Sequence, residues 1–140
     1  MSETAVFPAS DSMPDGQTSS LRVPPHSVEA EQAVIGGLLL DNRAWEQIAD
    51  KLVDDDFYRF DHRLLFAAIR ELESRNEPFD AVTLSQCLDK NGQLDQAGGL
   101  LYLGRLAKET PSASNIVAYA NIVREKSVLR QLIAVGTDIS

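Results

Sequence analysis

The sequence predicts an all-α protein, with a compact helical head followed by a long projecting helix. Two observations support this class. Apolar residues recur at spacings of three and four through most of the chain after residue 22. No segment alternates apolar and polar residues over a length that would favour a strand. The predicted organisation is a disordered tail over 1–22, a helical head over 23–111 and a final helix over 112–140.

Composition excludes several classes of protein. The 140 residues include 13 basic and 21 acidic side chains, which gives a net charge of −8. Affinity for nucleic acid depends on Lys and Arg displacing counterions, so a free-standing nucleic-acid binder is not expected. Apolar residues make up 44%, but no apolar run is long enough to span a membrane. With a single cysteine and no secretory signal, a soluble intracellular protein is expected.

The first helix is predicted to begin after Ser27, whose side chain suits an N-cap. Glu29 and Glu31 fall in its first turn, where the helix dipole favours anions. A stripe along one side of this helix, at spacings of four, three and four, is predicted at Val28, Gln32, Ile35 and Leu39, with Leu38 alongside.

Two further helices are predicted in the first half of the chain. One begins at Asp41 and ends at the run Asp54–Asp56. Its inward positions are Trp45, Ile48, Ala49, Leu52 and Val53. The next begins at Asp61, and residues 76–78 end it. Its inward positions are Leu64, Leu65, Ala68, Ile69 and Leu72.

The fourth and fifth helices are predicted to be short. Asp80 or Thr83 would cap the fourth, and Asn91-Gly92 would close it with a left-handed stop. The fifth is predicted over 97–108. The apolar positions of the two are Leu84, Cys87 and Leu88, then Leu100, Leu103 and Leu106.

The final helix carries two apolar stripes. Thr110-Pro111 breaks the chain, and the helix is predicted to open within 112–115. The first stripe is Ile116, Tyr119, Ala120 and Val123. The second is Val128, Leu132, Val135 and Ile139, widened by Leu129 and Ile133. At about 100° per residue the stripes lie roughly 140° apart, and the segment 124–127 between them is polar on every side.

Two stripes so far apart predict two different partners. The first half of the helix would pack on the head, while the second would project and pack against something else. The heptad-like spacing, uninterrupted up to Ser140, predicts that an antiparallel helix follows, as in a helical hairpin. The alternative is a bend that lays both stripes on one core. The candidate contact residues are Val128, Leu132, Ile133, Val135 and Ile139.

Motifs for catalysis or metal binding are weak. No glycine precedes a lysine, so the phosphate loop of ATP-binding proteins is absent and no cofactor is expected on this chain. His26 and His62 lack partners at metal-ligand spacing and are expected to be structural. Consecutive side chains point in different directions, so Asp54–Asp56 is expected to be a solvated helix end rather than a metal site. Cys87 is expected to be a small core residue.

Charge and glycine are unevenly distributed. Residues 28–56 contain eight acidic and two basic side chains, a net −6 of the total −8. A solvated face is expected there, with a docking surface for a basic partner as the alternative. Glycine inside a helix costs about 1 kcal/mol, so Gly36-Gly37 predicts close helix approach. For Gly98-Gly99 a helix start is the other interpretation.

Five segments, taken in order, resemble one known family. They are 22–38 (RVPPHSVEAEQAVIGGL), 55–58 (DDFY), 62–66 (HRLLF), 98–103 (GGLLYL) and 110–119 (TPSASNIVAY). From about Leu21 to Ser140 the chain resembles the N-terminal domain of bacterial replicative DNA helicases of the DnaB type. The tail before Leu21 lacks family character.

This resemblance implies a non-catalytic domain with a helical head and a helical hairpin, of which the final helix is the first arm. In that family the parent is a ring-shaped homohexamer that unwinds DNA in the 5′-to-3′ direction. Its motor domain, which this chain lacks, holds ATP, Mg and DNA. The N-terminal domains pair through their hairpins into a collar of three dimers, where the C-terminal domain of primase docks. A location in the bacterial cytoplasm, without membrane contact, is implied.

Two other functions stay open from the residues alone. One is a helical nucleic-acid-binding module, with 80–88 as part of a helix-turn-helix, which the acidic balance disfavours. The other is a small enzyme with an unrecognised carboxylate site, which the lack of a convergent polar cluster disfavours.

Overall fold

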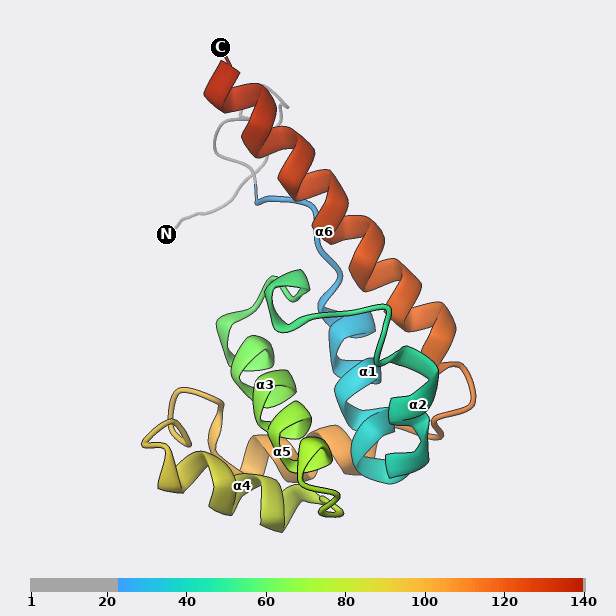
Figure 1. Ribbon diagram of the computed structural model, residues 1–140, viewed down its shortest axis with the longest axis vertical. Coiled ribbons are helices and arrows are strands. Elements are labelled where there is room, and N and C mark those ends of the chain that lie inside the picture. Colours follow the sequence, from blue (N-terminus) through green and yellow to red (C-terminus); the bar gives the residue numbers. More distant parts are fainter. Residues whose placement is uncertain (1–22, 140) are drawn as a thin grey trace, which may run out of the picture.

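The computed structural model describes residues 23–139, with side chains as far as Thr137 (Figure 1). Its elements in chain order are α1 (Val28–Leu40), η3 (Asn42–Ala44), α2 (Trp45–Ile48), η4 (Asp54–Asp56), α3 (Phe60–Ser74), α4 (Ala81–Lys90), α5 (Gly99–Glu109) and α6 (Ile116–Ile139). These described residues contain helices and no strand, which confirms the all-α class. The predicted tail over 1–22 lies outside the described residues, as does Ser140.

Helix α1 lies at the centre of the head. The Ser27 side chain caps it as predicted, accepting a hydrogen bond from the backbone N–H of Ala30 at 3.1 Å. The helix packs against α3, α5 and α6. All residues from Val34 to Leu39 are buried, so the single predicted stripe is too narrow. Neighbouring elements cover α1 on more sides than one amphipathic stripe can describe.

The glycine pair of α1 allows two other segments to approach its backbone. A Cβ atom on Gly36 would lie 2.0 Å from Thr110 Oγ1 and 2.6 Å from the carbonyl oxygen of Leu106. A Cβ atom on Gly37 would lie 3.3 Å from Cδ1 of Ile116. The predicted close approach is confirmed, and it involves the end of α5 and the start of α6.

The second helix is shorter than predicted. Helix α2 is a single turn that follows the 3-10 turn η3, and it ends at Ile48. Ile48 and Leu52 are buried as predicted. Ala49 and Val53 are exposed instead, with Val53 at 51%. The helical period does not apply to Val53, because the chain has already left the helix.

Helix α3 confirms the predicted inward face. Leu65, Ala68, Ile69 and Leu72 are buried, and Leu64 is half-buried. Phe66 is also completely buried, although the predicted face does not include it. Its ring lies 4.9 Å from the Phe57 ring and 5.4 Å from the Trp45 ring, measured between centroids. This aromatic cluster joins α3 to α2 and to the residue after η4.

Helix α4 begins and ends where the sequence predicts. The Asp80 side chain accepts from the backbone N–H of Thr83 at 2.9 Å, and Thr83 Oγ1 accepts from the backbone N–H of Asp80 at 2.8 Å. The first of these bonds holds the pKa of Asp80 below its ordinary value. Gly92, with φ 71°, provides the left-handed stop. The predicted core positions Leu84, Cys87 and Leu88 are all buried.

Helix α5 differs from its prediction at its first apolar position. Gly98 and Gly99 have φ angles of 104° and 80°, so this pair forms the helix start. Leu103 and Leu106 are buried, but Leu100 is 50% exposed. A spacing of three residues turns each side chain about 60° around a helix from the one before, which carries Leu100 away from the core.

We predict that Gly36→Ala destabilises the head by about 1–3 kcal/mol, because the added methyl group would overlap the Leu106 carbonyl oxygen and Thr110. Gly104→Ala on α5 is the matched control, since a Cβ atom there meets nothing within 4 Å. Helix propensity should make that control more stable by up to about 1 kcal/mol. Urea unfolding followed by fluorescence of the single Trp45 measures both changes. Equal stability of the two variants would contradict the close approach.

Candidate interaction surface on helix α6

The first half of α6 belongs to the core of the head. Ile116, Ala120 and Val123 are at most 1% exposed, as the first predicted stripe requires. Tyr119 is 37% exposed, so its assignment to this stripe is wrong. Its direction lies about 60° around the helix from Ile116, which is enough to bring it to the edge of the packed face.

The second half of α6 extends past the head (Figure 1). Leu132, Ile133 and Val135 are 62%, 56% and 55% exposed, and Val128 is half-buried. The side chain of Ile139, the last residue of α6, lies outside the described residues. The alternative in which a bend lays both stripes on one core is wrong, because α6 is one continuous helix and its second stripe faces outward. What contacts these residues stays a prediction.

The three aspartates of η4 have three different environments. Asp54 Oδ1 lies 2.8 Å from Nη2 of Arg70, and Asp55 is exposed. Asp56 is only 2% exposed and accepts a hydrogen bond from the Ser127 hydroxyl group at 2.8 Å. The expected solvated helix end is therefore wrong for Asp56. The segment 124–127 is polar as predicted, but one of its residues, Ser127, is buried at 2% exposed.

A buried polar network joins α1, α3 and α5. Nδ1 of His62 lies 2.8 Å from Glu31 Oε1, and its Nε2 lies 2.6 Å from the Tyr102 hydroxyl oxygen. The other Glu31 oxygen accepts from the backbone N–H of Tyr58 at 2.7 Å, and Gln32 donates to the Tyr102 hydroxyl oxygen at 3.2 Å. His62 and Glu31 are 0% and 1% exposed. Both ring nitrogens of the buried histidine are thus satisfied.

The network resembles a catalytic relay in outline only. A carboxylate accepts, so Nδ1 of His62 donates to Glu31, and in the neutral imidazole the Tyr102 hydroxyl group donates to Nε2. Activation of a tyrosine would require a lowered pKa. Burial instead raises the pKa of Tyr102 above its ordinary value. The arrangement connects three helices through hydrogen bonds. It does not favour the alternative of a small enzyme.

The sequence predicts a structural role for His62 but does not predict the network around it. From the sequence, Glu31 is predicted only to be an acidic residue in the first turn of a helix. A further signal is present, because Glu31 lies four residues before Ile35 and seven before Leu38, on the apolar side of α1. A charged residue on such a face needs a buried partner.

Several carboxylates of the acidic stretch over 28–56 already have partners within the chain. Glu31 and Asp56 are buried in hydrogen bonds, Asp41 pairs with Arg43 at 3.0 Å, and Asp54 pairs with Arg70. The carboxylates of this stretch that stay exposed are Glu29, Glu46, Asp50 and Asp55. A docking surface for a basic partner stays a prediction, and it would depend on these four.

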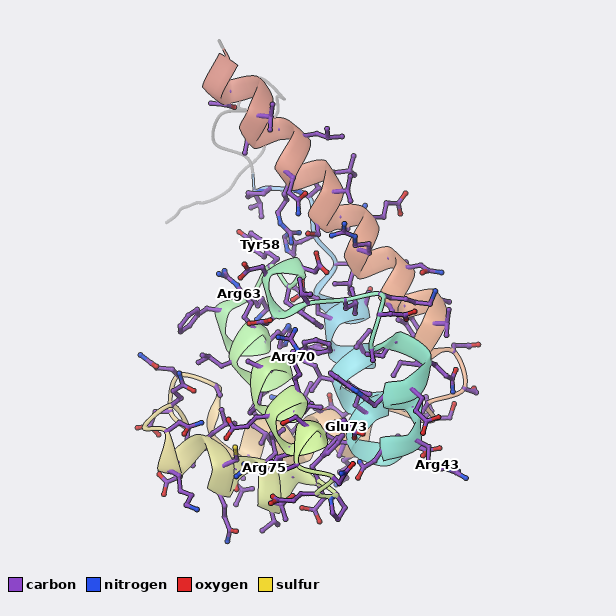
Figure 2. The ribbon with its side chains drawn as sticks, in the orientation of Figure 1. Arg43, Tyr58, Arg63, Arg70, Glu73 and Arg75 are labelled. Atoms are coloured by element: carbon purple, nitrogen blue, oxygen red, sulfur yellow. The ribbon has the colours of Figure 1, made fainter. Side chains whose placement is uncertain are left out.

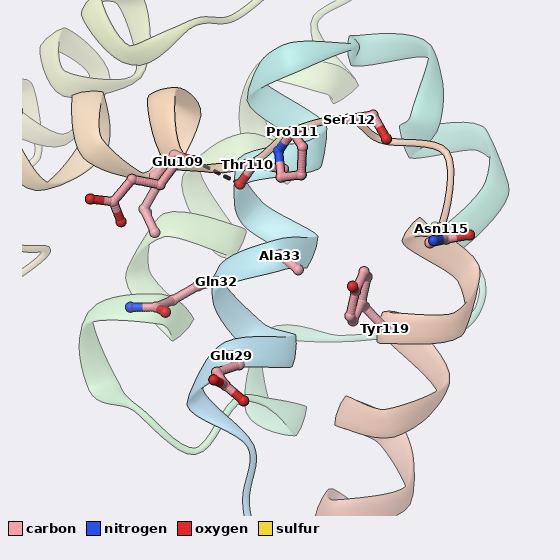
Figure 3. Close-up of a pocket in the computed structure, with 10 residues that line it drawn as sticks. Glu29, Gln32, Ala33, Glu109, Thr110, Pro111, Ser112, Asn115 and Tyr119 are labelled. Atoms are coloured by element: carbon pink, nitrogen blue, oxygen red, sulfur yellow. Dashed lines mark hydrogen bonds between the residues drawn. The ribbon is translucent and has the colours of Figure 1, made fainter.

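A pocket of about 220 Å³ lies between α1, the end of α5 and the start of α6 (Figure 3). Glu29 and Ala33 line it from α1, Glu109 and Thr110 from the α5 side, and Tyr119 from α6. Its lining contains no Lys or Arg, the residues that bind phosphate groups through charge.

Two other kinds of site are absent from the part of the chain that the structure describes. Over 23–137, where the structure describes side chains, no three His, Cys, Asp or Glu residues come together in a way that could hold a metal ion. No helix in the same range combines the length and the hydropathy of a membrane-spanning segment.

Comparison with known proteins identifies the family. The sequence profile of the DnaB-like helicase N terminal domain matches residues 23–125. The chain belongs to this DnaB family. It is 49% identical to the replicative DNA helicase DnaB of Haemophilus influenzae, over 90% of this chain and 27% of that protein. It is 46% identical to DnaB of Geobacillus stearothermophilus, over 86% of this chain and 27% of that protein. The chain thus spans about a quarter of the length of these relatives.

Solved structures show the same fold. The crystal structure of the N-terminal domain of DnaB from Mycobacterium tuberculosis superposes with a TM-score of 0.81 at 43% identity, covering 84% of this chain and 81% of that one. The N-terminal domain of DnaB from Helicobacter pylori, described together with its interactions with primase, superposes with a TM-score of 0.68 at 25% identity. That match covers 79% of this chain and 85% of the Helicobacter pylori chain. The DnaB N-terminal domain fold predicted from the resemblance is confirmed.

We predict that Tyr102→Phe destabilises the domain by about 1–3 kcal/mol, because it leaves Nε2 of the fully buried His62 without its hydrogen-bond partner. Tyr119→Phe is the matched control, since in the described part of the chain the Tyr119 hydroxyl group makes no hydrogen bond. Thermal unfolding by circular dichroism compares the two. A Tyr102→Phe protein as stable as the control would show that the Tyr102 hydroxyl group contributes nothing to stability.

Proposed function

We propose that this chain is the non-catalytic collar domain of a replicative DNA helicase, and that the projecting half of α6 is the first arm of a helical hairpin through which such domains associate. The observation that carries this proposal is the exposure of Leu132, Ile133 and Val135 on a helix that extends past its own head. Large apolar side chains grouped at the surface mark interaction sites.

Self-association is supported by the pattern of the arm. Val128, Leu132 and Val135 follow one another at spacings of four and three, the repeat that lets helices interlock side by side. Ile139 continues the repeat in the sequence. Assembly as a homohexamer built from three dimers belongs to this proposal, as does the division into a head at 23–111 and a first hairpin helix from 112 onward, whose outer half is the arm.

Primase is the second partner that we propose. Support comes from the Helicobacter pylori domain, whose structural description includes interactions with primase. The same exposed residues of α6 are candidates for this contact. Self-association and primase binding would then use one arm or adjoining parts of it.

The activity of the whole protein is also a proposal, because this chain covers 27% of its relatives from Haemophilus influenzae and Geobacillus stearothermophilus. Both relatives are bacterial proteins named as replicative DNA helicases. We propose that the parent unwinds DNA with ATP and Mg bound in a separate motor domain, that DNA contacts that domain rather than this one, and that the protein acts in the bacterial cytoplasm.

We predict that Leu132→Asp weakens self-association of the full-length helicase at least about tenfold, because a charge replaces a side chain whose burial contributes about 1.5–3 kcal/mol. Leu101→Asp is the matched control, as Leu101 is 86% exposed and belongs to α5, a helix far from the projecting half of α6 in Figure 1. Analytical ultracentrifugation measures the assembly, and circular dichroism shows that the head stays folded.

Two outcomes would contradict the proposed function. The Leu132→Asp protein could assemble like the wild type, which would remove the arm from the interface. Leu101→Asp could impair assembly as strongly as Leu132→Asp, which would mean that a new surface charge alone causes the defect.

A further inference from the structure

The contact between α6 and the head changes character along the helix. Ile116, Ala120 and Val123 bury apolar side chains, and Val123 is the last of them. The next residue of the same face is Ser127, which is buried but polar. From Arg124 onward, hydrogen bonds and one aromatic contact connect α6 to the described part of the head. We call this region the neck and define it as Asp56, Arg124, Ser127 and Arg130, with the Pro25 carbonyl group.

Asp56 is the acceptor at the centre of the neck. Its Oδ1 accepts from Arg124 Nη1 and from the Ser127 hydroxyl group, each at 2.8 Å. Its Oδ2 accepts from the backbone N–H of Val53 at 2.9 Å. The carboxylate is therefore held by its own segment and by two consecutive turns of α6. Such charge-assisted bonds are the strong ones among hydrogen bonds, and they are directional.

Arg130 makes a second connection one turn further along α6. Its Nη1 donates to the Pro25 carbonyl oxygen at 2.8 Å, and its Nη2 donates to the Asp56 carbonyl oxygen at 2.7 Å. The guanidinium carbon lies 5.5 Å from the centre of the Tyr58 ring, against which the His26 ring stacks at 4.2 Å. Tyr58 lies at the end of α3 nearest the projecting half of α6, opposite Arg75 (Figure 2).

One guanidinium group thus connects α6 to two other segments. These are the segment before α1, which runs beside α6 in Figure 1, and the turn η4. The forked donors of arginine meet both carbonyl groups at once, a geometry that a lysine ammonium group does not reproduce. Sliding or rotation of α6 would break several of these bonds together.

We propose that the neck is a polar clamp that sets the direction in which the arm leaves the head. The apolar contacts up to Val123 hold the base of α6, while the neck determines the path of the remainder. Sixteen residues follow Val123, or about 24 Å of helix, so a change of about 10° in helix direction at Val123 moves the tip by about 4 Å. One consequence of this inference rests on the proposed function: when two arms of fixed direction associate, the two heads are held in fixed positions.

The test measures the direction of the arm within one molecule. Spin labels are attached at Lys90→Cys on α4 and Ala134→Cys on α6, both exposed, in a Cys87→Ala background. An excess of unlabelled chain removes distances between molecules. Pulsed electron double resonance should show one narrow distance in the otherwise unaltered chain. Arg130→Ala should replace it with a broad distribution, because two hydrogen bonds and the contact with Tyr58 are lost.

Arg130→Ala is preferred to a change of Asp56, because it leaves Asp56 paired with Arg124 and Ser127 and orphans no buried charge. Arg105→Ala on α5 is the matched control, as it removes an exposed arginine that pairs with Glu109. Fluorescence of Trp45 must show a folded head in each variant. If Arg130→Ala disturbs the head, Arg130→Met takes its place, because methionine keeps an unbranched side chain but donates to neither carbonyl group.

Two results would overturn the proposal: an Arg130 variant with a folded head that keeps the narrow distance, or Arg105→Ala broadening the distance as much. The result is separate from the fate of the proposed function. The distance is measured within single molecules, whereas Leu132→Asp tests association. A rigid arm that does not associate would refute the proposed function alone, and an associating arm without a fixed direction would refute the clamp alone.

Discussion

The burial of α1 is the constraint on which the rest of the head depends. Because neighbours cover most of this helix, its polar groups need partners inside the protein, and its backbone must allow close approach. Glu31 meets the first need through His62 and the backbone of Tyr58. Gly36 meets the second by leaving room for Thr110 and the end of α5. The other helices take their positions from contacts with this one element or with its direct neighbours.

Helix α6 passes through three environments along its length. Its start is apolar and buried, its middle is held by Asp56, and its second half exposes large apolar side chains. Each environment follows from which part of the head the helix has reached. A helix that served only the core would have no reason to continue its apolar repeat after the head ends. This change of environment is the physical basis for treating the outer half as an interaction surface.

Several titratable side chains of the head form hydrogen bonds that connect its helices and turns. His62, Glu31 and Tyr102 join three helices, and Asp56 joins a turn to α6. Networks of this kind are specific because each member is satisfied only in one arrangement. They explain how the helices of the head keep fixed positions relative to one another.

The sequence by itself determined the helical class, most helix boundaries, the family and the outward stripe at Leu132. These follow from local periodicity, from caps such as Ser27 and Asp80, and from motifs in order. Only the tertiary structure decided that Asp56 is buried, that Leu100 is exposed and that Glu31 meets His62. The reason is physical: periodicity reports which side of a helix is apolar, whereas burial of a given side chain depends on which distant segments cover it. Partners such as Glu31 and His62 lie 31 residues apart, and no local pattern joins them.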